Sequence, residues 1–501
     1  MNMKKILFLL VIVLLVCSCE SYLDQTNPNK ITIDTFFKTE DDFLQALVSA
    51  YTPLRNPYGG YYNARSVEIR NYRGDDIITR NDTEDCYQIY LFINSPENVT
   101  VQNLFQHAYS GVYRTNMILE KLTESDLSTE FIDQIKGEAL FLRGLYYFIL
   151  ATEFKDVPLR MNSSQNPETF PIPKSTQEEV YAQVANDWKA ASELLPVQAL
   201  NNGRATKGAA LAFLGKLYMY TQKYTDAISV LEPLTKAPYK YRLMENYTYN
   251  FDLDHEYNDE SIFEITYQKV GSATDRWGTE VMNAMMTTPL NRFFSAADCG
   301  GYDICNASPK LLDMMISELD KDGNYDCRAI ASLAWNYPGC QYFNKPFSES
   351  IKPVNQGKIF IKKNTYADYL DKDKAAESDF NEKAYRYSNV LLFLSEAYLQ
   401  SGNASKAIEY LNLIRQRANL KLLDNMIDNT AIMNDIIKQR AIEFVREGER
   451  FYDLRRWGLL EQEIKTTSVE RASNFSKRNY YLPIPSKEIQ TNPECTQSEG
   501  W

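Results

Sequence analysis

Two segments of this 501-residue chain repeat the same arrangement of large and small residues. Each opens on a Leu-small-x-x-Tyr motif, reaches an alanine nine residues after the tyrosine, and ends on a leucine four residues later. The residues are Leu214, Gly215, Tyr218, Ala227 and Leu231 in the first segment, and Leu394, Ser395, Tyr398, Ala407 and Leu411 in the second. This spacing is typical of a tetratricopeptide unit, in which a small residue on one helix receives a bulky side chain from its antiparallel partner. The chain is therefore expected to contain such helix pairs.

A long stretch separates the two units, which argues against a simple solenoid of tandem repeats. Apolar residues at helical spacing extend over residues 130–154, and a further helix is expected over 176–195, capped by Ser175 with Glu178 three residues on. Residues 235–381, in contrast, are rich in Tyr, Asn, Asp and Gly and have poor helical periodicity. The predicted fold class is mainly α: a tetratricopeptide-like scaffold of helical pairs with long irregular insertions. Because binding residues concentrate in irregular segments on a rigid scaffold, we expect the 235–381 insertion to bind the ligand.

The N-terminus has the pattern of a bacterial lipoprotein. Two lysines precede an unbroken apolar run over residues 6–16, which is shorter than the roughly 20 residues of a membrane-spanning helix. The run is followed by Ser18-Cys19, and a small residue directly before cysteine resembles the bacterial lipobox. We therefore expect residues 1–18 to be a lipoprotein signal peptide, Cys19 to carry the lipid, and residues 19–501 to form a single domain. The alternative is an ordinary cleaved signal peptide.

Charge and histidine content argue against several classes of function. The chain has 66 acidic and 54 basic residues, a net charge of −12, so its surface repels phosphate backbones and nucleic acid is not an expected partner. Its only histidines, His107 and His255, lie far apart, which argues against zinc chemistry or a Ser-His-Asp triad. The G-x-S-x-G, H-E-x-x-H and Walker A motifs are also missing from the sequence. We predict a protein without catalytic residues, metal or cofactor; a glycosidase acting through a carboxylate pair is the competing hypothesis.

The densest charged motif lies near the C-terminal end, and its residue types resemble those of a catalytic cluster. Its members are Glu443, Glu447, Arg450, Arg455 and Arg456. Glutamate and arginine at these helical spacings more often form ion pairs that tie helices together. We therefore predict a structural role for this cluster.

Aromatic residues beside hydrogen-bonding side chains define the candidate ligand site. Sugar rings stack their C–H faces on aromatic planes, while their hydroxyls need Asn, Asp or Arg, so a sugar site needs both kinds of residue. The candidates are Trp277, Trp335, Tyr337, Asn336 and Arg276 in the insertion, and Asp75, Asp76 and Arg80 in an earlier stretch. The structural alternatives stay open: the aromatics equally suit the core of the insertion, and an aspartate after glycine is ordinary turn chemistry.

One acidic loop has the alternating oxygen ligands of a calcium site. The residues are Asp320, Asp322, Asn324 and Asp326. Gly323, however, stands at position four of the loop, where an EF-hand needs glycine at position six. A solvated turn is the preferred interpretation, with Ca²⁺ as the alternative.

The cysteines that follow the signal peptide leave two interpretations open. Cys299 with Cys305, and Cys327 with Cys340, are close enough in sequence to pair in an exported protein. Buried thiols agree equally well with the sequence.

The chain resembles the SusD/RagB family of outer-membrane nutrient-binding lipoproteins of Bacteroidetes. Motifs that carry the resemblance run from one end to the other in the expected order: Cys19-Glu20-Ser21-Tyr22-Leu23-Asp24, residues 138–148, 156–159, 203–210 and 440–458, and Leu482-Pro483-Ile484-Pro485. The last residues depart slightly from the usual Gln-Asn-Pro-Gly-Tyr ending.

This resemblance implies a mostly helical fold with four tetratricopeptide-like helix pairs. It also implies a location, lipid-anchored at the outer membrane and exposed at the cell surface, and a partner, a SusC-like TonB-dependent transporter on which the lipoprotein sits as a lid. The implied function is binding of an oligo- or polysaccharide for import. Peptide capture, as in RagB-like members, is the alternative within the family.

Overall fold

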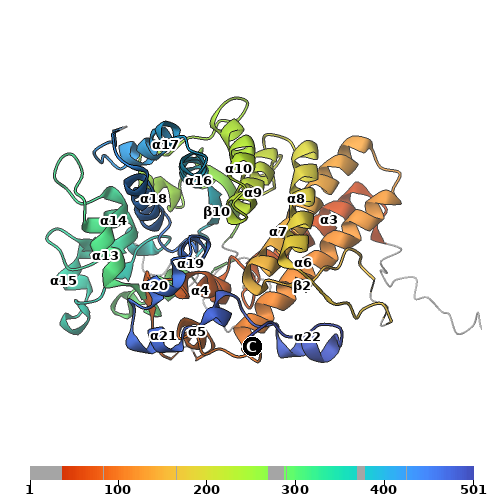
Figure 1. Cartoon of the computed structure of the whole chain (residues 1–501), viewed down its shortest axis with the longest axis horizontal. Coiled ribbons are helices and arrows are strands. Elements are labelled where there is room, and N and C mark those ends of the chain that lie inside the picture. Colours follow the sequence, from red (N-terminus) through yellow and green to blue (C-terminus); the bar gives the residue numbers. More distant parts are fainter. Residues whose placement is uncertain are drawn as a thin grey trace, which may run out of the picture.

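Helices dominate the computed structural model, which describes residues 36–501 except 83, 165, 167, 269–286, 289, 369–377 and 425. The N-terminal part contains α3 (Glu40–Tyr51), α4 (Ala64–Tyr72), α5 (Glu84–Tyr90), α6 (Val99–Thr123), α7 (Thr129–Phe154), α8 (Gln177–Leu194), α9 (Lys207–Tyr220) and α10 (Tyr224–Leu231). Shorter helices follow, α12 (Leu290–Phe294), α13 (Pro309–Ile316), α14 (Cys327–Ser332) and α15 (Phe347–Ser350). The C-terminal part contains α16 (Tyr387–Gln400), α17 (Ala404–Arg417), α18 (Asn429–Glu443), α19 (Arg450–Arg456), α20 (Leu460–Ile464), α21 (Val469–Asn474) and α22 (Ser486–Thr491). The prediction of a mainly helical fold is confirmed (Figure 1).

The strands of the described residues are short and pair two by two in antiparallel fashion. The pairs are β1 (Ile77–Thr79) with β5 (Cys305–Ala307), β2 (Val157–Pro158) with β3 (Lys174–Ser175), β4 (Ser261–Ile265) with β10 (Glu382–Arg386), β6 (Leu333–Ala334) with β9 (Phe360–Ile361), and β7 (Gln341–Tyr342) with β8 (Lys345–Pro346). The β4–β10 pair connects the irregular segment to the scaffold, because β10 leads directly into α16.

Both repeated segments form the helix pairs that their spacing predicts, α9 with α10 and α16 with α17. A Cβ added at Gly215 would lie 2.3 Å from Leu231 Cδ2, so the missing side chain on α9 makes room for the leucine on α10. In the second pair, the Ser395 hydroxyl donates to the Ala407 carbonyl oxygen at 2.8 Å. The small residue of each motif therefore sets how closely its two helices approach.

The two pairs are neighbours in space although they are far apart in sequence. α10 packs directly against α16, and Figure 1 shows α9, α10, α16 and α17 side by side. The chain between Leu231 and α16 therefore leaves the scaffold and returns to it. Figure 1 also shows α13, α14 and α15, which belong to this excursion, at the opposite end of the molecule from α3, α6 and α8. The excursion covers the irregular stretch that was expected to be an insertion.

The start of α8 differs by one residue from the prediction. Thr176, not Ser175, is the N-cap, and it forms a capping box with Glu179. Ser175 is extended instead, because it is the last residue of β3 and pairs with Val157. Both Ser175-x-x-Glu178 and Thr176-x-x-Glu179 fit the capping-box pattern, and only the strand pairing separates them.

Two large hydrophobic clusters share the interior. The first is built by the scaffold helices and contains Trp188, which is fully buried and donates its indole N–H to the Phe141 carbonyl oxygen at 3.1 Å. The second lies beneath β1, β5, β6 and β9 and contains Trp335. This second cluster joins residues of the excursion to Tyr72 on α4, Ile77 on β1 and Ile442 on α18, whereas a third, smaller cluster around Tyr342 and Phe360 is built from the excursion alone.

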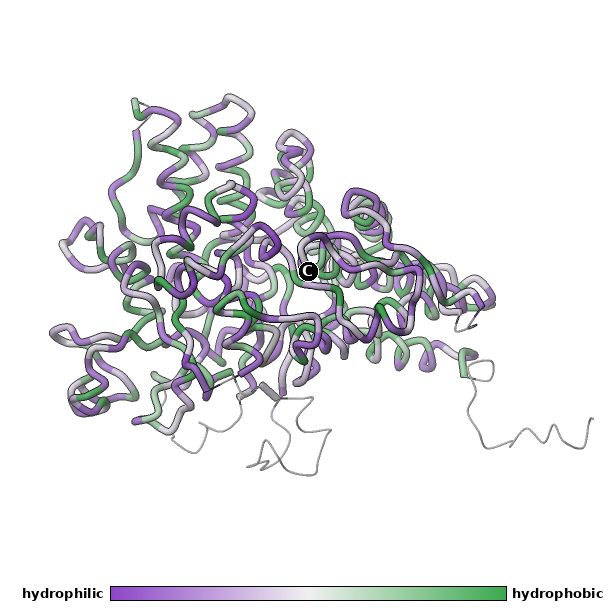
Figure 2. The backbone as a smooth tube through the Cα atoms, turned by 60° about the horizontal axis from the view of Figure 1, so that its bottom comes forward, coloured by the Kyte–Doolittle hydropathy of each residue, from purple (hydrophilic) through white to green (hydrophobic). Residues whose placement is uncertain are grey.

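Hydrophobic and hydrophilic residues alternate along the helices (Figure 2). In the described part of the chain, no helix is long and apolar enough to cross a membrane.

Candidate functional site

Two short strand pairs, β1–β5 and β6–β9, lie side by side and bring candidate residues from distant parts of the sequence into one ribbon. Beyond the β1–β5 pair, Ala307 at the end of β5 donates its N–H to the Ile359 carbonyl oxygen at 2.9 Å, directly before β9. β9 in turn pairs with β6. Arg80 directly follows β1 and Trp335 directly follows β6, so residues 255 positions apart stand at strands of the same ribbon. The strands thus place two of the sequence-predicted segments in one region of the molecule.

Half-buried tyrosines surround the second cluster. They are Tyr87, Tyr302, Tyr325 and Tyr337, and we call them the aromatic rim. The Tyr337 ring lies 4.2 Å from the Trp335 ring, tilted by 34°, and Tyr325 meets both rings edge-on at 5.8 and 5.7 Å. Asn336, which separates these two residues in the sequence, is exposed. An aromatic surface and an exposed amide therefore stand together, as a sugar site requires.

Trp335 itself belongs to the core rather than to the surface. Its side chain is only 7% exposed and packs within the second hydrophobic cluster. This burial favours the structural alternative for Trp335 and leaves Tyr337, which is half-buried beside it, as the more accessible of the two rings. Trp335 then supports the position of Tyr337.

Arg80 places a partly exposed cation beside the segment of Tyr302, one tyrosine of the aromatic rim. Its side chain is 41% exposed and pairs with Asp82 at 2.6 Å, while a second guanidinium nitrogen donates to the Tyr302 carbonyl oxygen. The Tyr302 ring is covered by the Arg292 guanidinium at 5.4 Å, and its hydroxyl accepts a hydrogen bond from Arg292 at 3.0 Å. Arg80 thus fixes the segment that presents one tyrosine of the aromatic rim.

Asp75 and Asp76, in contrast, are buried below this surface. The Asp75 carboxylate forms ion pairs with Arg450 Nε and Lys310 Nζ, each at 2.7 Å. These ion pairs connect the segment that follows α4 to α19 and α13. Burial, reinforced by the charge of Asp75, raises the pKa of Asp76 to about 7. Both carboxyl groups lie in the interior of the protein, which favours a structural role over contact with a ligand.

Three of the predicted functional residues, Arg276, Trp277 and Cys19, lie outside the described residues. The first two belong to the same excursion as Tyr302, Tyr325 and Tyr337 of the aromatic rim. Their assignment as ligand-binding or lipid-carrying residues therefore stays a prediction.

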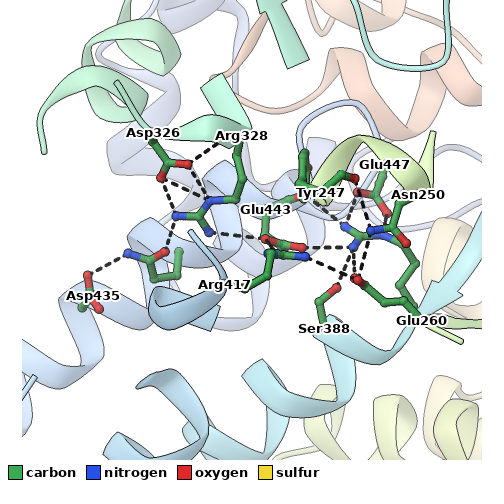
Figure 3. Close-up of polar contacts among 12 residues, drawn as sticks. Tyr247, Asn250, Glu260, Asp326, Arg328, Ser388, Arg417, Asp435, Glu443 and Glu447 are labelled. Carbon is green, nitrogen blue, oxygen red and sulfur yellow. Dashed lines mark hydrogen bonds and ion pairs between the residues drawn. The ribbon is translucent and has the colours of Figure 1, made fainter. Parts of the chain in front are cut away.

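The C-terminal charged motif forms buried ion pairs, as predicted. Glu443 is fully buried and lies between Arg328 and Arg417, with Arg386 contributing a third guanidinium at 3.0 Å (Figure 3). Burial alone would raise the pKa of Glu443, but the charges of Arg417, Arg386 and Arg328 outweigh it and hold the pKa well below its usual value. Since Arg328 comes from α14, Arg386 from β10 and Arg417 from α17, the network locks the excursion to the scaffold.

The partners of this motif come from distant segments more often than from neighbouring turns. Arg456 pairs with Asp453 three residues away, but also with Glu396 on α16. Arg450 pairs with Asp75, and Glu447 with Arg386 and with Lys363. Arg455 forms no ion pair among the described residues and instead donates to the carbonyl oxygens of Thr152 and Tyr480 at 2.9 and 2.8 Å. Helical spacing therefore identified most of the paired residues but not their partners.

The acidic loop is organised as a turn. The Asp320 carboxylate accepts the backbone N–H groups of Asp322 and Asn324 at 2.9 and 2.8 Å. Asp326 is the N-cap of α14 and its carboxylate pairs with Arg328 at 2.6 Å. Among the described residues, no group of three His, Cys, Asp or Glu side chains is placed to hold a metal ion. The geometry thus favours the solvated turn over Ca²⁺.

The state of Cys327, at the start of α14, decides whether the Cys327–Cys340 pairing is formed. It is an exposed residue whose thiol forms no disulfide in the structure. The Cys327–Cys340 bond is therefore not present.

Two family models together match almost the whole chain. The model of the "SusD family" matches residues 149–501, and one described as "Starch-binding associating with outer membrane" matches residues 21–219. Among curated proteins, SusD-like protein P25 of Formosa agariphila is 23% identical over 534 residues, covering 100% of this chain and 99% of its own.

Solved structures share the fold. A SusD superfamily protein from Bacteroides vulgatus is 44% identical, with a TM-score of 0.87 over 93% of this chain and 100% of its own. Surface glycan-binding protein A from Bacteroides thetaiotaomicron, solved with laminarihexaose, is 23% identical, with a TM-score of 0.74 over 91% of this chain and 99% of its own. At that lower identity the likeness is one of fold alone.

Proposed function

The chain belongs to the SusD family, and we propose that it is a cell-surface lipoprotein that binds glycans at the aromatic rim and delivers them to a SusC-like TonB-dependent transporter. The observation that carries the proposal is the close contact of the Trp335 and Tyr337 rings, with centroids 4.2 Å apart, together with the exposed Asn336 that separates these two residues in the sequence. Tyr337 offers an aromatic plane to a sugar ring, while Asn336 and Arg80 offer donors to its hydroxyls. A laminarihexaose complex of a protein with the same fold supports carbohydrate as the ligand class.

The proposal includes binding without catalysis. Two solved structures with the same fold are named as a laminarin-binding protein and a surface glycan-binding protein, and the most densely charged motif of this chain forms buried ion pairs. Purified protein is expected to bind its glycan without consuming it. Product formation that follows the protein through purification would instead support a glycosidase.

A glycan array run beside a peptide-library pulldown tests the ligand class. Tyrosine, asparagine and arginine suit peptides as well as sugars, so the RagB-like alternative predicts capture of peptides and no array signal. The glycan proposal predicts the reverse. Peptide capture that Tyr337→Ala weakens would move the ligand class to peptides and keep the site.

Replacing Tyr337 by alanine should weaken glycan binding by about 1–3 kcal/mol, the scale of a lost aromatic contact. The side chain is half-buried at the edge of its cluster, so the melting temperature should change little. Titration calorimetry with the glycan found on the array, alongside melting curves, measures both effects. Tyr58→Ala is the matched control, because Tyr58 is 59% exposed and does not belong to the aromatic rim. Equal affinities for the two variants would remove Tyr337 from the site.

Replacing Cys19 by alanine should release the protein from the membrane fraction into a soluble pool. Without the cysteine no lipid can be attached, and the described helices contain no span that would hold the chain in a bilayer. Fractionation of cells that express either form, followed by immunoblotting, measures the distribution. Sedimentation of the Cys19→Ala protein with outer membranes in high salt would contradict lipid anchoring.

A further inference from the structure

A cleft lies where the scaffold meets the excursion, and none of the four tyrosines of the aromatic rim lines it. It is formed by residues 197–199, 202–204 and 206 between α8 and α9, residues 238–241 after α10, and residues 257–259 and 261–264 before and along β4. Its volume is about 270 Å³, just below the range of about 300–1,000 Å³ that holds a drug-sized ligand. The cleft therefore suits a short ligand or the end of a long one.

Stacked tyrosines form one wall of this cleft. The Tyr239 and Tyr241 rings are nearly parallel, 11° apart, with centroids separated by 5.9 Å. Tyr387, the first residue of α16, backs Tyr241 at 6.2 Å and anchors the stack on the scaffold. Tyr241 covers one face of Tyr239, so a ligand ring placed on the other face would continue the stack. The half-buried state of Tyr239 agrees with such a ledge.

Neutral amides stand at the mouth of the cleft. Gln198 and Asn202 are both exposed, and within the described part of the chain neither side chain has a hydrogen-bond partner. Each amide carries a donor and an acceptor, which is the combination that a hydroxyl group satisfies. The mouth thus offers unused hydrogen-bonding capacity next to an aromatic ledge.

Most charged groups of the cleft are neutralised by partners. Arg204 forms a two-pronged contact with Glu138 beside the cleft, and Glu264 pairs with Lys383. Asp259 pairs with Arg242 at 2.7 Å. Lys240 is exposed, and in the described residues it has no ion-pair partner, so one free cation remains at the edge. The cleft therefore selects a neutral or weakly acidic ligand over a strongly charged one.

We propose that this cleft is a second carbohydrate site, which holds the end or a short stretch of the same glycan that the aromatic rim binds. The inference rests on the proposed function, because it takes the ligand to be a polymer of neutral, hydroxyl-rich rings. Such a ring stacks its C–H face on Tyr239 and gives its hydroxyls to Asn202 and Gln198. Two sites on one chain raise the affinity for a polymer without raising the affinity for a fragment that fills a single site.

The test compares polymers with short fragments. Laminarin, soluble starch and xylan, and the hexasaccharide of each, are titrated against wild type, Tyr239→Ala, Asn202→Ala and Tyr337→Ala. The second site predicts that Tyr239→Ala and Asn202→Ala raise the Kd of the bound polysaccharide about tenfold or more and leave hexasaccharide binding at the aromatic rim unchanged. Tyr337→Ala should weaken the binding of both.

Asn201→Ala is the matched control, since Asn201 is an exposed neighbour that does not line the cleft. Polysaccharide binding that Tyr337→Ala weakens, but that Tyr239→Ala and Asn202→Ala leave at the level of Asn201→Ala, overturns the second site and spares the proposed function. Binding of no glycan by wild type overturns both. Melting curves of each variant confirm that affinities refer to folded protein.

Discussion

Replacing Glu443 by glutamine should destabilise the fold by about 3–5 kcal/mol, the usual cost of breaking a buried ion pair from one side. Glutamine keeps the shape of the side chain but removes the negative charge that Arg328, Arg386 and Arg417 share. Three guanidinium groups would then lie buried around a neutral amide. The shift of the urea unfolding midpoint measures this loss of stability.

Glu461→Gln is the matched control for this change. Glu461 pairs with Lys465 one turn away, but its side chain is 47% exposed, so losing that pair should leave the urea unfolding midpoint nearly unchanged. If Glu443→Gln unfolds at the same urea concentration as Glu461→Gln, the network does not hold the excursion to the scaffold. A large loss for Glu443→Gln alone supports that role.

The pH dependence of stability follows from the same residue. The folded-state pKa of Glu443 lies below its ordinary value of 4.5, so folding favours the ionised form. The resulting stabilisation is fully present above pH 4.5 and is lost as the pH falls below it through the folded pKa. The free energy of unfolding of wild type should therefore fall more steeply on acidification than that of Glu443→Gln, so that the difference in stability between the two proteins narrows.

The scaffold was largely predictable because its signals are local. The spacing of Tyr218, Ala227 and Leu231 within one helix pair specifies the contact that the structure shows between α9 and α10. The packing of α10 on α16 was not predictable in this way, because it joins segments on either side of a long excursion. The start of α8 was misplaced by one residue because the deciding contact, Ser175 with Val157, lies in a strand rather than in the helix.

The candidate site was predicted in part, for a related reason. Residue type indicates that Asp75 and Arg80 can both bind hydroxyls, but the two side chains differ in their exposure to solvent. Asp75 is enclosed because Arg450, 375 residues later, folds against it, whereas Arg80 stays partly exposed. Such long-range partners leave no trace in the spacing of a single segment. The tyrosines Tyr87, Tyr302 and Tyr325 of the aromatic rim were missed, because they come from separate segments of the chain that only the tertiary fold brings against one cluster.

Replacing Trp335 by alanine should destabilise the protein by about 3–5 kcal/mol, the usual cost of truncating a buried tryptophan. The residue is almost completely buried, and its ring supports both Tyr325 and Tyr337. A cavity at this place should also loosen Tyr337, so glycan affinity should fall together with stability. Trp335→Phe, which refills much of the space, should recover most of both.

Tyr337→Ala gives the contrasting result that separates support from contact, since it should lower affinity while leaving the melting temperature nearly unchanged. Urea unfolding and calorimetric titration of the three variants under the same conditions make the comparison. Suppose that Trp335→Ala leaves the unfolding midpoint unchanged and abolishes binding. Trp335 would then be a ligand-stacking residue reached by opening of the excursion, and its buried position would describe only the ligand-free protein.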